Sequence, residues 1–286
     1  MSATNLNKLI ADAGRKLQKV GIEAGAAEAE IILCDILDCD RLFLYLHGPS
    51  MIDDEVVDKF NSIIEKRLTR YPLQYILGSA WFYGRKFVVN ESVMVPTPET
   101  ELLLESALRA VRFCRSDPVK FLDVGVGSGV VGISAKLENK ALDITAIDIS
   151  EAALHVARFN ADRFEVDGSI QFLQSDLFET LPKERFDIIV SNPPYITEGD
   201  YDGLEPEVKA DPKLALVSGP KGLDFIERLI AESPDHLIRP GFLMFEMGYN
   251  QSQEIFEMVR SDGRYADYSL LKDLADIDRV IICKVM

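Results

Sequence analysis

Apolar residues at the start of the chain recur with the period of an amphipathic helix. Six of them mark its buried face: Leu6, Leu9, Ile10, Ala13, Leu17 and Val20. Gly21 follows as a stop, and the stretches 24–38 and 53–68 also read as helices, with the sequence HGPS at 47–50 as a break. The pattern predicts a small helical bundle over residues 1–72, with no recognisable chemistry of its own.

The pattern changes between residues 73 and 96, where aromatic, β-branched and glycine residues are mixed. This composition favours a β-hairpin or an extended connector. The segment contains Trp81, the only tryptophan of the chain, which we interpret as a core residue or a plug between domains.

From residue 97 to residue 286, apolar runs of strand length alternate with helical segments. Strands are predicted at 119–125, 142–148, 169–176, 186–192 and 241–248, and two more close the chain. Such alternation predicts an α/β domain with a doubly wound sheet.

One predicted strand runs straight into two prolines, in the sequence FDIIVSNPPYI at 186–196. Proline donates no hydrogen bond to a sheet and restricts the residue before it, so this strand must end at Ser191 or Asn192. Taken alone, the Asn-Pro dipeptide indicates only a stiff loop. The rest of the chain gives the motif a second interpretation.

A glycine-rich turn follows the first strand of the α/β region, in the sequence FLDVGVGSGVVG. Gly125, Gly127 and Gly129 permit positive φ angles and let the backbone approach a ligand, next to the free N–H groups of a helix start. Together with Gly132, the last two also satisfy the dinucleotide pattern GxGxxG, which is a weak signal alone. The alternative is that these glycines only tighten a strand-to-helix turn.

Two acids and an amide end the next three strands. Asp148 is placed to accept hydrogen bonds from both hydroxyls of a ribose, although it could instead cap the following helix, a role that Ser150 could also fill. Asp176 and Asn192 end the strands after it. Ligands of such sheets lie beyond the carboxyl ends of the strands, so the four connections predict one binding site.

Composition narrows the classes of function. The chain has 286 residues, a net charge of −16 and a sequence pI of about 4.7, a balance that argues against non-specific nucleic-acid binding. No stretch has the length of a membrane span or the pattern of a signal peptide, so we expect a cytoplasmic protein. The four cysteines and three histidines are dispersed, which predicts structural thiols and no metal site.

With GxGxG after the first strand, an acid after the second, SD after the third and NPPY after the fourth, the chain resembles class I S-adenosylmethionine-dependent methyltransferases. Within that group it is similar, over essentially its whole length, to the protein-(glutamine-N5) methyltransferases that modify peptide-chain release factors. The segments that match are the N-terminal helical region, YILG, PTPETE, NPPYI, DPKLALVSGPKGLDF and GFLMFEMG.

The resemblance implies a Rossmann-like methyltransferase domain at 97–286, preceded by a hairpin connector at 73–96 and a helical substrate-recognition domain at 1–72. It implies that a methyl group passes from S-adenosylmethionine to the side-chain amide nitrogen of the glutamine in a Gly-Gly-Gln motif of a release factor, which leaves S-adenosylhomocysteine. We expect a monomer that binds no nucleic acid, membrane or metal. The residues implied to bind the cofactor are Gly125, Val126, Gly127, Ser128, Gly129, Asp148, Asp176, Leu177 and Asn192.

The catalytic residues that the resemblance implies are Asn192, Pro193 and Tyr195, and together with Pro194 they would bind the substrate. An amide nitrogen is a poor nucleophile, and its two N–H groups need two acceptors, which the Asn192 side chain and the Pro193 carbonyl supply. Tyr195 would stack on the planar amide. Positioning and electrostatics would therefore carry the catalysis.

The chain departs from the family pattern in two places. Thr97 stands where the family usually has arginine, and this change affects the local support of the part of the site that would hold the cofactor. At 273–279 the usual Asp-x-x-Gly-x-x-Arg spacing is altered and the glycine is missing, which concerns a loop near the C-terminus.

Three other functions compete with glutamine methylation. Adenine-N6 methyltransferases share NPPY and would flip the base out of the duplex first, but the net charge argues against them. A dehydrogenase would leave NPPY unexplained. An adaptor that binds the cofactor without catalysis is disfavoured by the intact motif at 192–195.

Overall fold

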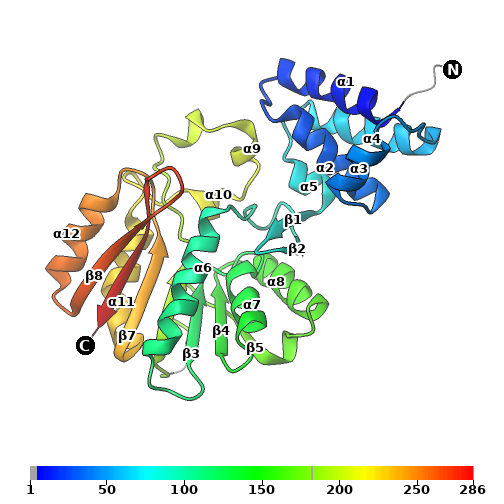
Figure 1. Ribbon diagram of the computed structural model, residues 1–286. Coiled ribbons are helices and arrows are strands. Elements are labelled where there is room, and N and C mark those ends of the chain that lie inside the picture. Colours follow the sequence, from blue (N-terminus) through cyan, green and yellow to red (C-terminus); the bar gives the residue numbers. More distant parts are fainter. Residues whose placement is uncertain (1–4, 182, 286) are drawn as a thin grey trace. The chain divides into compact units, whose positions relative to one another are not determined.

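The computed structural model describes residues 5–181 and 183–285, so the first four residues of the predicted helical region and residue 286 lie outside the described residues (Figure 1). The chain divides into two compact units. One comprises Met1–Gly78 together with Glu205–Ala210, and the other comprises Ser79–Leu204 and Asp211–Met286. A short piece of the later sequence therefore belongs to the N-terminal unit.

Within the described residues, the N-terminal part of the first unit is a bundle of five helices, as predicted for residues 1–72, but the fifth helix lies in the segment 73–77, which the sequence pattern assigns to the connector. They are α1 (Leu6–Lys19), α2 (Gly25–Leu37), α3 (Arg41–His47), α4 (Asp54–Arg67) and α5 (Leu73–Leu77). Asn5 caps α1, because its side chain accepts a hydrogen bond of 2.9 Å from the N–H of Lys8. Fully buried apolar side chains, among them Leu17, Ile32 and Phe60, form the core between the helices.

Residues 205–210 join this unit through ion pairs. They contain the short helix α9 (Pro206–Lys209), and Glu207 contacts both Arg67 and Arg70 at 2.6–2.7 Å. Arg67 also pairs with Glu28, and its side chain is only 5% exposed. Burial raises the pKa of Glu207, but the hydrogen bonds from the two arginines outweigh it and lower that pKa to about 2.

The second unit begins with the predicted hairpin, formed by β1 (Ser79–Phe82) and β2 (Arg85–Val88). Gly84 has a φ of +71° in the turn between them. Phe82 and Phe87 are the buried side chains of the hairpin, whereas Trp81 is 68% exposed. The prediction that Trp81 fills the core is therefore wrong, because alternation along β1 turns it to the outer face.

A mixed, mostly parallel sheet of seven strands follows and confirms the predicted α/β class (Figure 1). Its strands are β3 (Lys120–Val124), β4 (Asp143–Asp148), β5 (Ile170–Gln174), β6 (Phe186–Ser191), β7 (Leu237–Glu246), β8 (Tyr265–Lys272) and β9 (Asp278–Val285). Their order is β5-β4-β3-β6-β7-β9-β8. The first five are parallel, and β9 and β8 add the antiparallel edge.

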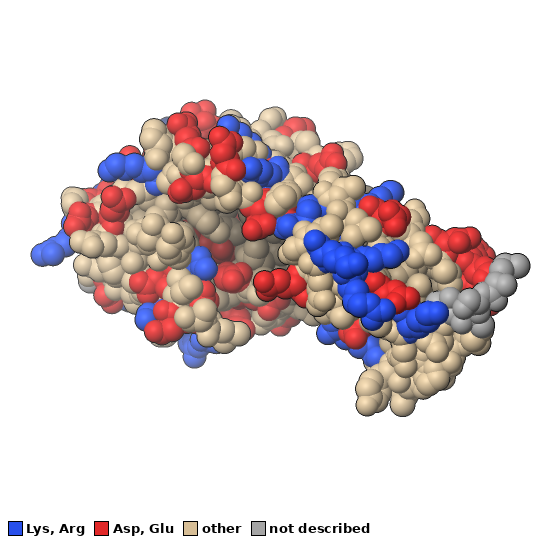
Figure 2. All heavy atoms as spheres, turned by 90° about the horizontal axis from the view of Figure 1, so that it is seen from above, with Lys and Arg blue, Asp and Glu red and all other residues tan. Residues whose placement is uncertain are grey.

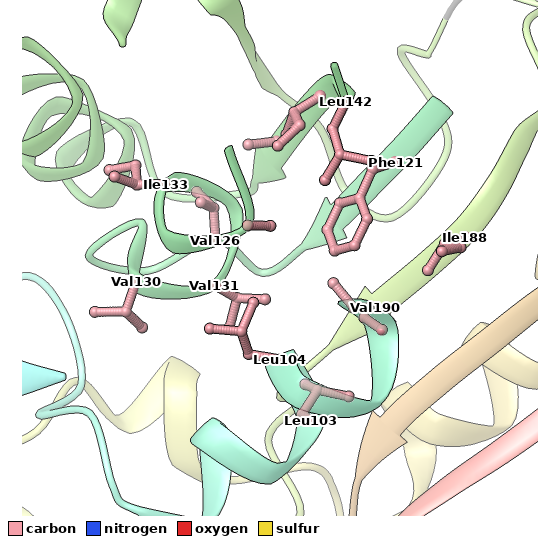
Figure 3. Close-up of a cluster of buried hydrophobic side chains, with 14 of the residues drawn as sticks. Leu103, Leu104, Phe121, Val126, Val130, Val131, Ile133, Leu142, Ile188 and Val190 are labelled. Carbon is pink, nitrogen blue, oxygen red and sulfur yellow. The ribbon is translucent and has the colours of Figure 1, made fainter. Parts of the chain in front are cut away.

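Helices cover both faces of this sheet. On one face lie α6 (Glu99–Ala110), α7 (Val130–Glu138) and α8 (Glu151–Arg163), whose buried apolar side chains share one cluster with Phe121, Ile188 and Val190. Figure 3 shows side chains of α6 and α7 beside these strand residues. On the other face, α11 (Asp224–His236) and α12 (Ser252–Asp262) pack on the alternate residues Leu122 and Ile189. The remaining pieces are short: α10 (Lys213–Leu216) and the 3-10 turns Val111–Phe113, Asp167–Ser169 and Tyr201–Gly203.

One strand is longer than the apolar pattern predicts. The strand β7 starts at Leu237, four residues before the predicted start, and includes Pro240. The pairing of β6 with β7 has a register shift between Phe186 and Ile188, so the proline falls in the irregular part of the ladder.

No helix among the described residues is both long enough and apolar enough to cross a membrane. Acidic side chains are spread over the face shown in Figure 2, as the net charge of −16 requires, and basic side chains gather on part of the helical unit.

Candidate functional site

The carboxyl ends of β3, β4, β5 and β6 surround a cavity of about 380 Å³. It lies at the junction of β3 with β4 and β6, where the order of the sheet reverses, which is the usual ligand position in such folds. Ten of the residues that the sequence predicts for the site line it: Gly125, Val126, Gly127, Ser128, Asp148, Asp176, Leu177, Asn192, Pro193 and Pro194. Gly129 and Tyr195 are not among the residues that line it.

The glycine turn has the backbone that its sequence predicts. Gly125, Gly127 and Gly129 have φ angles of +73°, +52° and +85°. A Cβ added to Gly125 or Gly127 would meet no described atom within 4 Å, so the backbone is open on that side. At Gly129 the same Cβ would lie 2.6 Å from the Ile133 side chain, so this glycine serves the packing of α7.

Asp148 joins the glycine turn to the end of β4. Its Oδ2 accepts a hydrogen bond of 3.0 Å from the N–H of Gly127, and its Oδ1 accepts one of 2.9 Å from Ser150. Burial raises the pKa of this carboxyl, against the lowering effect of these hydrogen bonds. The cap of α8 is Ser150, whose hydroxyl accepts from the N–H of Ala153 at 3.2 Å. Helix capping therefore does not explain Asp148.

A buried amide ties the hairpin to the glycine turn. Asn160 of α8 is fully buried and donates hydrogen bonds of 2.9 Å to the carbonyls of Val88 and Ser128. Its Oδ1 accepts the N–H of Val88 at 2.8 Å. The connector thus supports the turn through one side chain.

After β5, Asp176 and Leu177 form the next wall of the cavity. Asp176 accepts a hydrogen bond of 3.0 Å from the Arg228 guanidinium of α11. Leu177 is 2% exposed and has a φ of +46°, an uncommon angle for a side chain of its kind.

The motif after β6 is held by side chains. Ser191 donates a hydrogen bond of 2.9 Å to the carbonyl of Val124 on the neighbouring strand. The Nδ2 of Asn192 donates to the hydroxyl of Thr100 at 3.0 Å, which fixes the amide. Within the described part of the chain, neither the Asn192 Oδ1 nor the Pro193 carbonyl accepts a hydrogen bond. Both predicted acceptors are thus available to a ligand.

Tyr195 anchors the far end of the motif. Its carbonyl accepts a hydrogen bond of 3.0 Å from Nε2 of Gln251, which also donates to Gly222 at 3.2 Å. Its ring packs against the apolar cluster beneath α11 and α12, and burial raises its pKa to about 12. A role for this ring against the substrate amide stays a prediction.

Three residues at the site were missed in the sequence: Asp123, Thr100 and Glu246. Asp123 lines the cavity, is 3% exposed and accepts a hydrogen bond of 2.9 Å from Gly132. Burial raises its pKa to about 7. The signal for Asp123 was present, because it is an acid at the strand end just before the glycine turn. Glu246 is likewise an acid at the end of its strand, β7, whereas Thr100 carried no such signal, since its partner Asn192 is remote in sequence.

The lining of the cavity fits a nucleoside-containing ligand that carries a positive charge. Open glycine backbone, an acid at the end of β4 and a buried acid at the end of β3 face a space bounded by apolar side chains. Acids at these positions complement ribose hydroxyls and a cationic centre.

Comparison with known proteins agrees with this geometry, which defines a class I methyltransferase. Residues 98–205 match the Methyltransferase small domain, and residues 8–78 match the PrmC N-terminal domain. A crystal structure of a methyltransferase from Pyrococcus furiosus has the same fold, with a TM-score of 0.51 and 18% identity over 71% of this chain and 90% of that one.

Relatives in sequence identify the family. The chain is 35% identical to a release factor glutamine methyltransferase from Bacillus cereus, over 94% of this chain and 95% of the relative. It is also 35% identical to one from Geobacter sulfurreducens, over 93% of this chain and 91% of that protein. The chain belongs to the release factor glutamine methyltransferase family.

Proposed function

We propose that this protein transfers a methyl group from S-adenosylmethionine to the side-chain amide nitrogen of a glutamine in a peptide-chain release factor. The observation that carries the proposal is the pair of unoccupied acceptors at Asn192 and Pro193, on the rim of a cavity suited to the cofactor. Membership of the family supports the identity of the substrate.

The cofactor would lie along the glycine turn. The backbone of Gly125 and Gly127 would approach the cofactor closely. Asp148 would accept hydrogen bonds from the ribose hydroxyls, and the side chain of Leu177 would cover the base. Bound there, S-adenosylmethionine supplies a methyl group on a positively charged sulfur. We assign Asp176 to the same side of the cavity, with Arg228 orienting its carboxylate.

The glutamine amide would be held by its two N–H groups. One donates to Oδ1 of Asn192 and the other to the carbonyl of Pro193, which directs the nitrogen lone pair toward the methyl group. Methyl transfer would place positive charge on the nitrogen, and the two acceptors, Oδ1 of Asn192 and the carbonyl of Pro193, would bind its N–H groups more strongly then than before. One proton of the methylated amide would afterwards pass to water.

The N-terminal helical unit would recognise the release factor. Its helix α3 exposes Leu42, Tyr45 and Leu46, which are 62%, 85% and 66% exposed, and such a patch suits a protein partner. Tyr45→Ser with Leu46→Ser should raise KM for the release factor and leave kcat within about twofold. An unchanged KM would contradict this role.

The function is tested by methyl transfer from labelled S-adenosylmethionine to purified release factor. Label should enter the glutamine of the Gly-Gly-Gln motif and should be absent when that glutamine is replaced by alanine. DNA and RNA serve as parallel substrates. Label in either nucleic acid, with none in the release factor, would overturn the proposal in favour of base methylation.

A further inference from the structure

The side chain of Gln251 joins three segments that meet beside the SNPPY loop. It is 6% exposed, and both its amide nitrogen and its amide oxygen have partners. Its Nε2 donates to the carbonyl of Tyr195 at 3.0 Å and to that of Gly222 at 3.2 Å. Its Oε1 accepts the N–H of Gly248 at 2.8 Å. We call these hydrogen bonds together the Gln251 clasp.

The start of α12 does not explain a glutamine at this position. Gln251 is the N-cap residue of that helix, where serine, threonine, aspartate and asparagine are preferred because their short side chains bond the first N–H groups. The side chain of Gln251 makes no such cap hydrogen bond. Its two N–H groups are donated instead to two carbonyl oxygens of other segments. The side chain therefore serves those segments and not the helix.

Two glycines of the clasp let the backbone approach Tyr195 closely. A Cβ added to Gly222 would lie 2.2 Å from the carbonyl oxygen of Tyr195 and 3.0 Å from Nε2 of Gln251. A Cβ added to Gly248 would lie 2.9 Å from Oε1 of Gln251 and 3.5 Å from Cδ2 of the Tyr195 ring. The clasp therefore lies against both the backbone and the ring of this tyrosine.

The SNPPY loop needs a hold of this kind because its middle is proline. Pro193 and Pro194 have no backbone N–H, so they donate no hydrogen bond to a neighbouring segment. On one side of them, Asn192 donates to Thr100 at 3.0 Å. On the other side, the carbonyl of Tyr195 accepts from the clasp. The position of the Pro193 carbonyl, the second proposed acceptor, is therefore set by the fixed points on either side of the prolines.

The clasp also fastens the loop to one wall of the cavity. One residue beyond Tyr195, the carbonyl of Ile196 accepts the N–H of Ser218 at 3.0 Å. Ser218 lines the cavity, and its hydroxyl accepts the N–H of Phe225, another lining residue, at 2.8 Å. Gly222 lies between these two lining residues in the sequence. Its hydrogen bond to the clasp thus ties the wall and the loop to the same side chain.

We propose that Gln251 is a positioning residue for methyl transfer, which fixes Tyr195 and, through the loop, the Pro193 carbonyl. The inference rests on the proposed function of the SNPPY loop. Gln251 is not among the residues that line the cavity, so it acts through the loop and not on the ligand. Without the clasp, the Pro193 carbonyl would move while Asn192 stays held by Thr100. The two acceptors would then lose the fixed spacing that orients the substrate amide.

The first test separates catalysis from binding. Gln251→Met keeps the length of the side chain and removes the hydrogen bonds of the clasp. Its kcat should fall about tenfold, the scale of one hydrogen bond. The Kd for S-adenosylhomocysteine and the KM for the release factor should each change less than about twofold, because neither ligand contacts the clasp. A fall in kcat with an equal loss of cofactor affinity would overturn the inference, as would a wild-type kcat.

The matched control for this test is Gln253→Met. Gln253 is exposed and lies two residues further along the chain, in α12. The same exchange of glutamine for methionine should leave its kcat at the wild-type value. An equal fall in kcat in both variants would assign the effect to α12 in general and would overturn the role of Gln251.

A second variant tests the clasp if Gln251→Met does not fold. Gly248→Ala keeps the glutamine, but the added methyl group would press on Oε1 of Gln251 and on the Tyr195 ring. It should lower kcat less than Gln251→Met and leave cofactor affinity unchanged. Gly168→Ala is its control, because a Cβ there meets no described atom within 4 Å. A folded Gly248→Ala variant with the kcat of Gly168→Ala would contradict the inference.

A measurement without release factor separates this inference from the proposed function. The ring resonances of Tyr195 in protein labelled with ¹³C-tyrosine are assigned by their loss in Tyr195→Phe. They should shift in Gln251→Met and stay unchanged in Gln253→Met. Resonances that are the same in Gln251→Met and in the wild type would refute the positioning role even if methyl transfer is confirmed. A clear shift in a protein that methylates no release factor would retain the hold on Tyr195 and refute only the proposed function.

Discussion

The glycine turn after β3 and the SNPPY loop after β6 line the same cavity but are held through different groups. The backbone of the turn makes the contacts: the N–H groups of Gly125 and Val126 both donate to the carbonyl of Ile147 at 2.9 Å, and the side chains of Asp148 and Asn160 bond the backbone of Gly127 and Ser128. The loop contains two prolines and has few N–H groups to offer. It depends on side chains from elsewhere, namely Thr100 and Gln251.

The contrast follows from what each loop would bind. A cofactor that approaches the backbone closely needs space and positive φ, which glycine provides within a few residues. A reacting amide needs acceptors at fixed points, which requires a stiff chain and partners that hold its side chains. The first site therefore presents glycine backbone to its ligand, and the second presents acceptors whose loop is held by side chains from other segments. The predictions below act on one loop or the other.

The largest effect should come from Asn192. Asn192→Ala should lower kcat by about 10²–10³, the usual cost of one preorganised transition-state hydrogen bond, with little change in cofactor affinity. Asn192→Asp keeps an acceptor to which Thr100 is able to donate, and should retain more activity than alanine. Steady-state kinetics and calorimetry measure the two quantities. A near wild-type kcat in Asn192→Ala would show that the SNPPY sequence forms only a stiff loop and has no catalytic role.

Asp148, at the end of β4, should show an effect on cofactor binding. Asp148→Ala removes the proposed ribose acceptor and the partner of the Gly127 N–H, so cofactor binding should weaken by about 1–3 kcal/mol. Asp176→Ala, at an acid already paired with Arg228, is the comparison and should have the smaller effect. Calorimetry with S-adenosylhomocysteine measures both. Tight NAD binding with none of this ligand would refute the cofactor assignment.

The glycines themselves should differ from one another. Gly127→Ala places a methyl group in open space at a φ of +52°, so only backbone strain of about 1–2 kcal/mol is expected in stability. Gly129→Ala adds a contact of 2.6 Å with Ile133 and 3.3 Å with Ala157, so its loss of stability should be greater. Thermal melting ranks the two. Equal melting temperatures would show that α7 yields to the added methyl group.

The last prediction concerns the stability of the fold against pH. Burial raises the pKa of Asp123 and of Glu246 to about 7, so the native state binds their protons more tightly than the unfolded chain does. Stability of the second unit should therefore fall as pH rises from about 4.5 to 7 because of these acids. Chemical unfolding of the wild type and of Glu246→Gln measures this slope. If Glu246→Gln leaves this slope unchanged, the dependence of stability on pH comes from other groups.

Much of this protein was determined locally by its sequence. The period of apolar residues predicted α1, α2 and α4. A helix that buries one face has apolar residues every three to four positions, and this repeat is visible within a short stretch of sequence. Glycines and prolines at 125–129 and 193–194 marked the ends of β3 and β6, since those residues restrict the backbone directly. Asp148 and Asn192 could be placed at one edge because the carboxyl ends of parallel strands share it.

Only the tertiary structure decided how those residues are held. Asn192 and Thr100 are 92 positions apart, and Tyr195 and Gln251 are 56 apart, so no local pattern relates them. The same holds for Glu205–Ala210, which joins the helical unit through Arg67 and Arg70, and for Trp81, whose exposure depends on the face that β1 turns outward. A hydrogen bond or an ion pair between distant segments leaves no period in the sequence, because it depends on where the folded chain brings two side chains together.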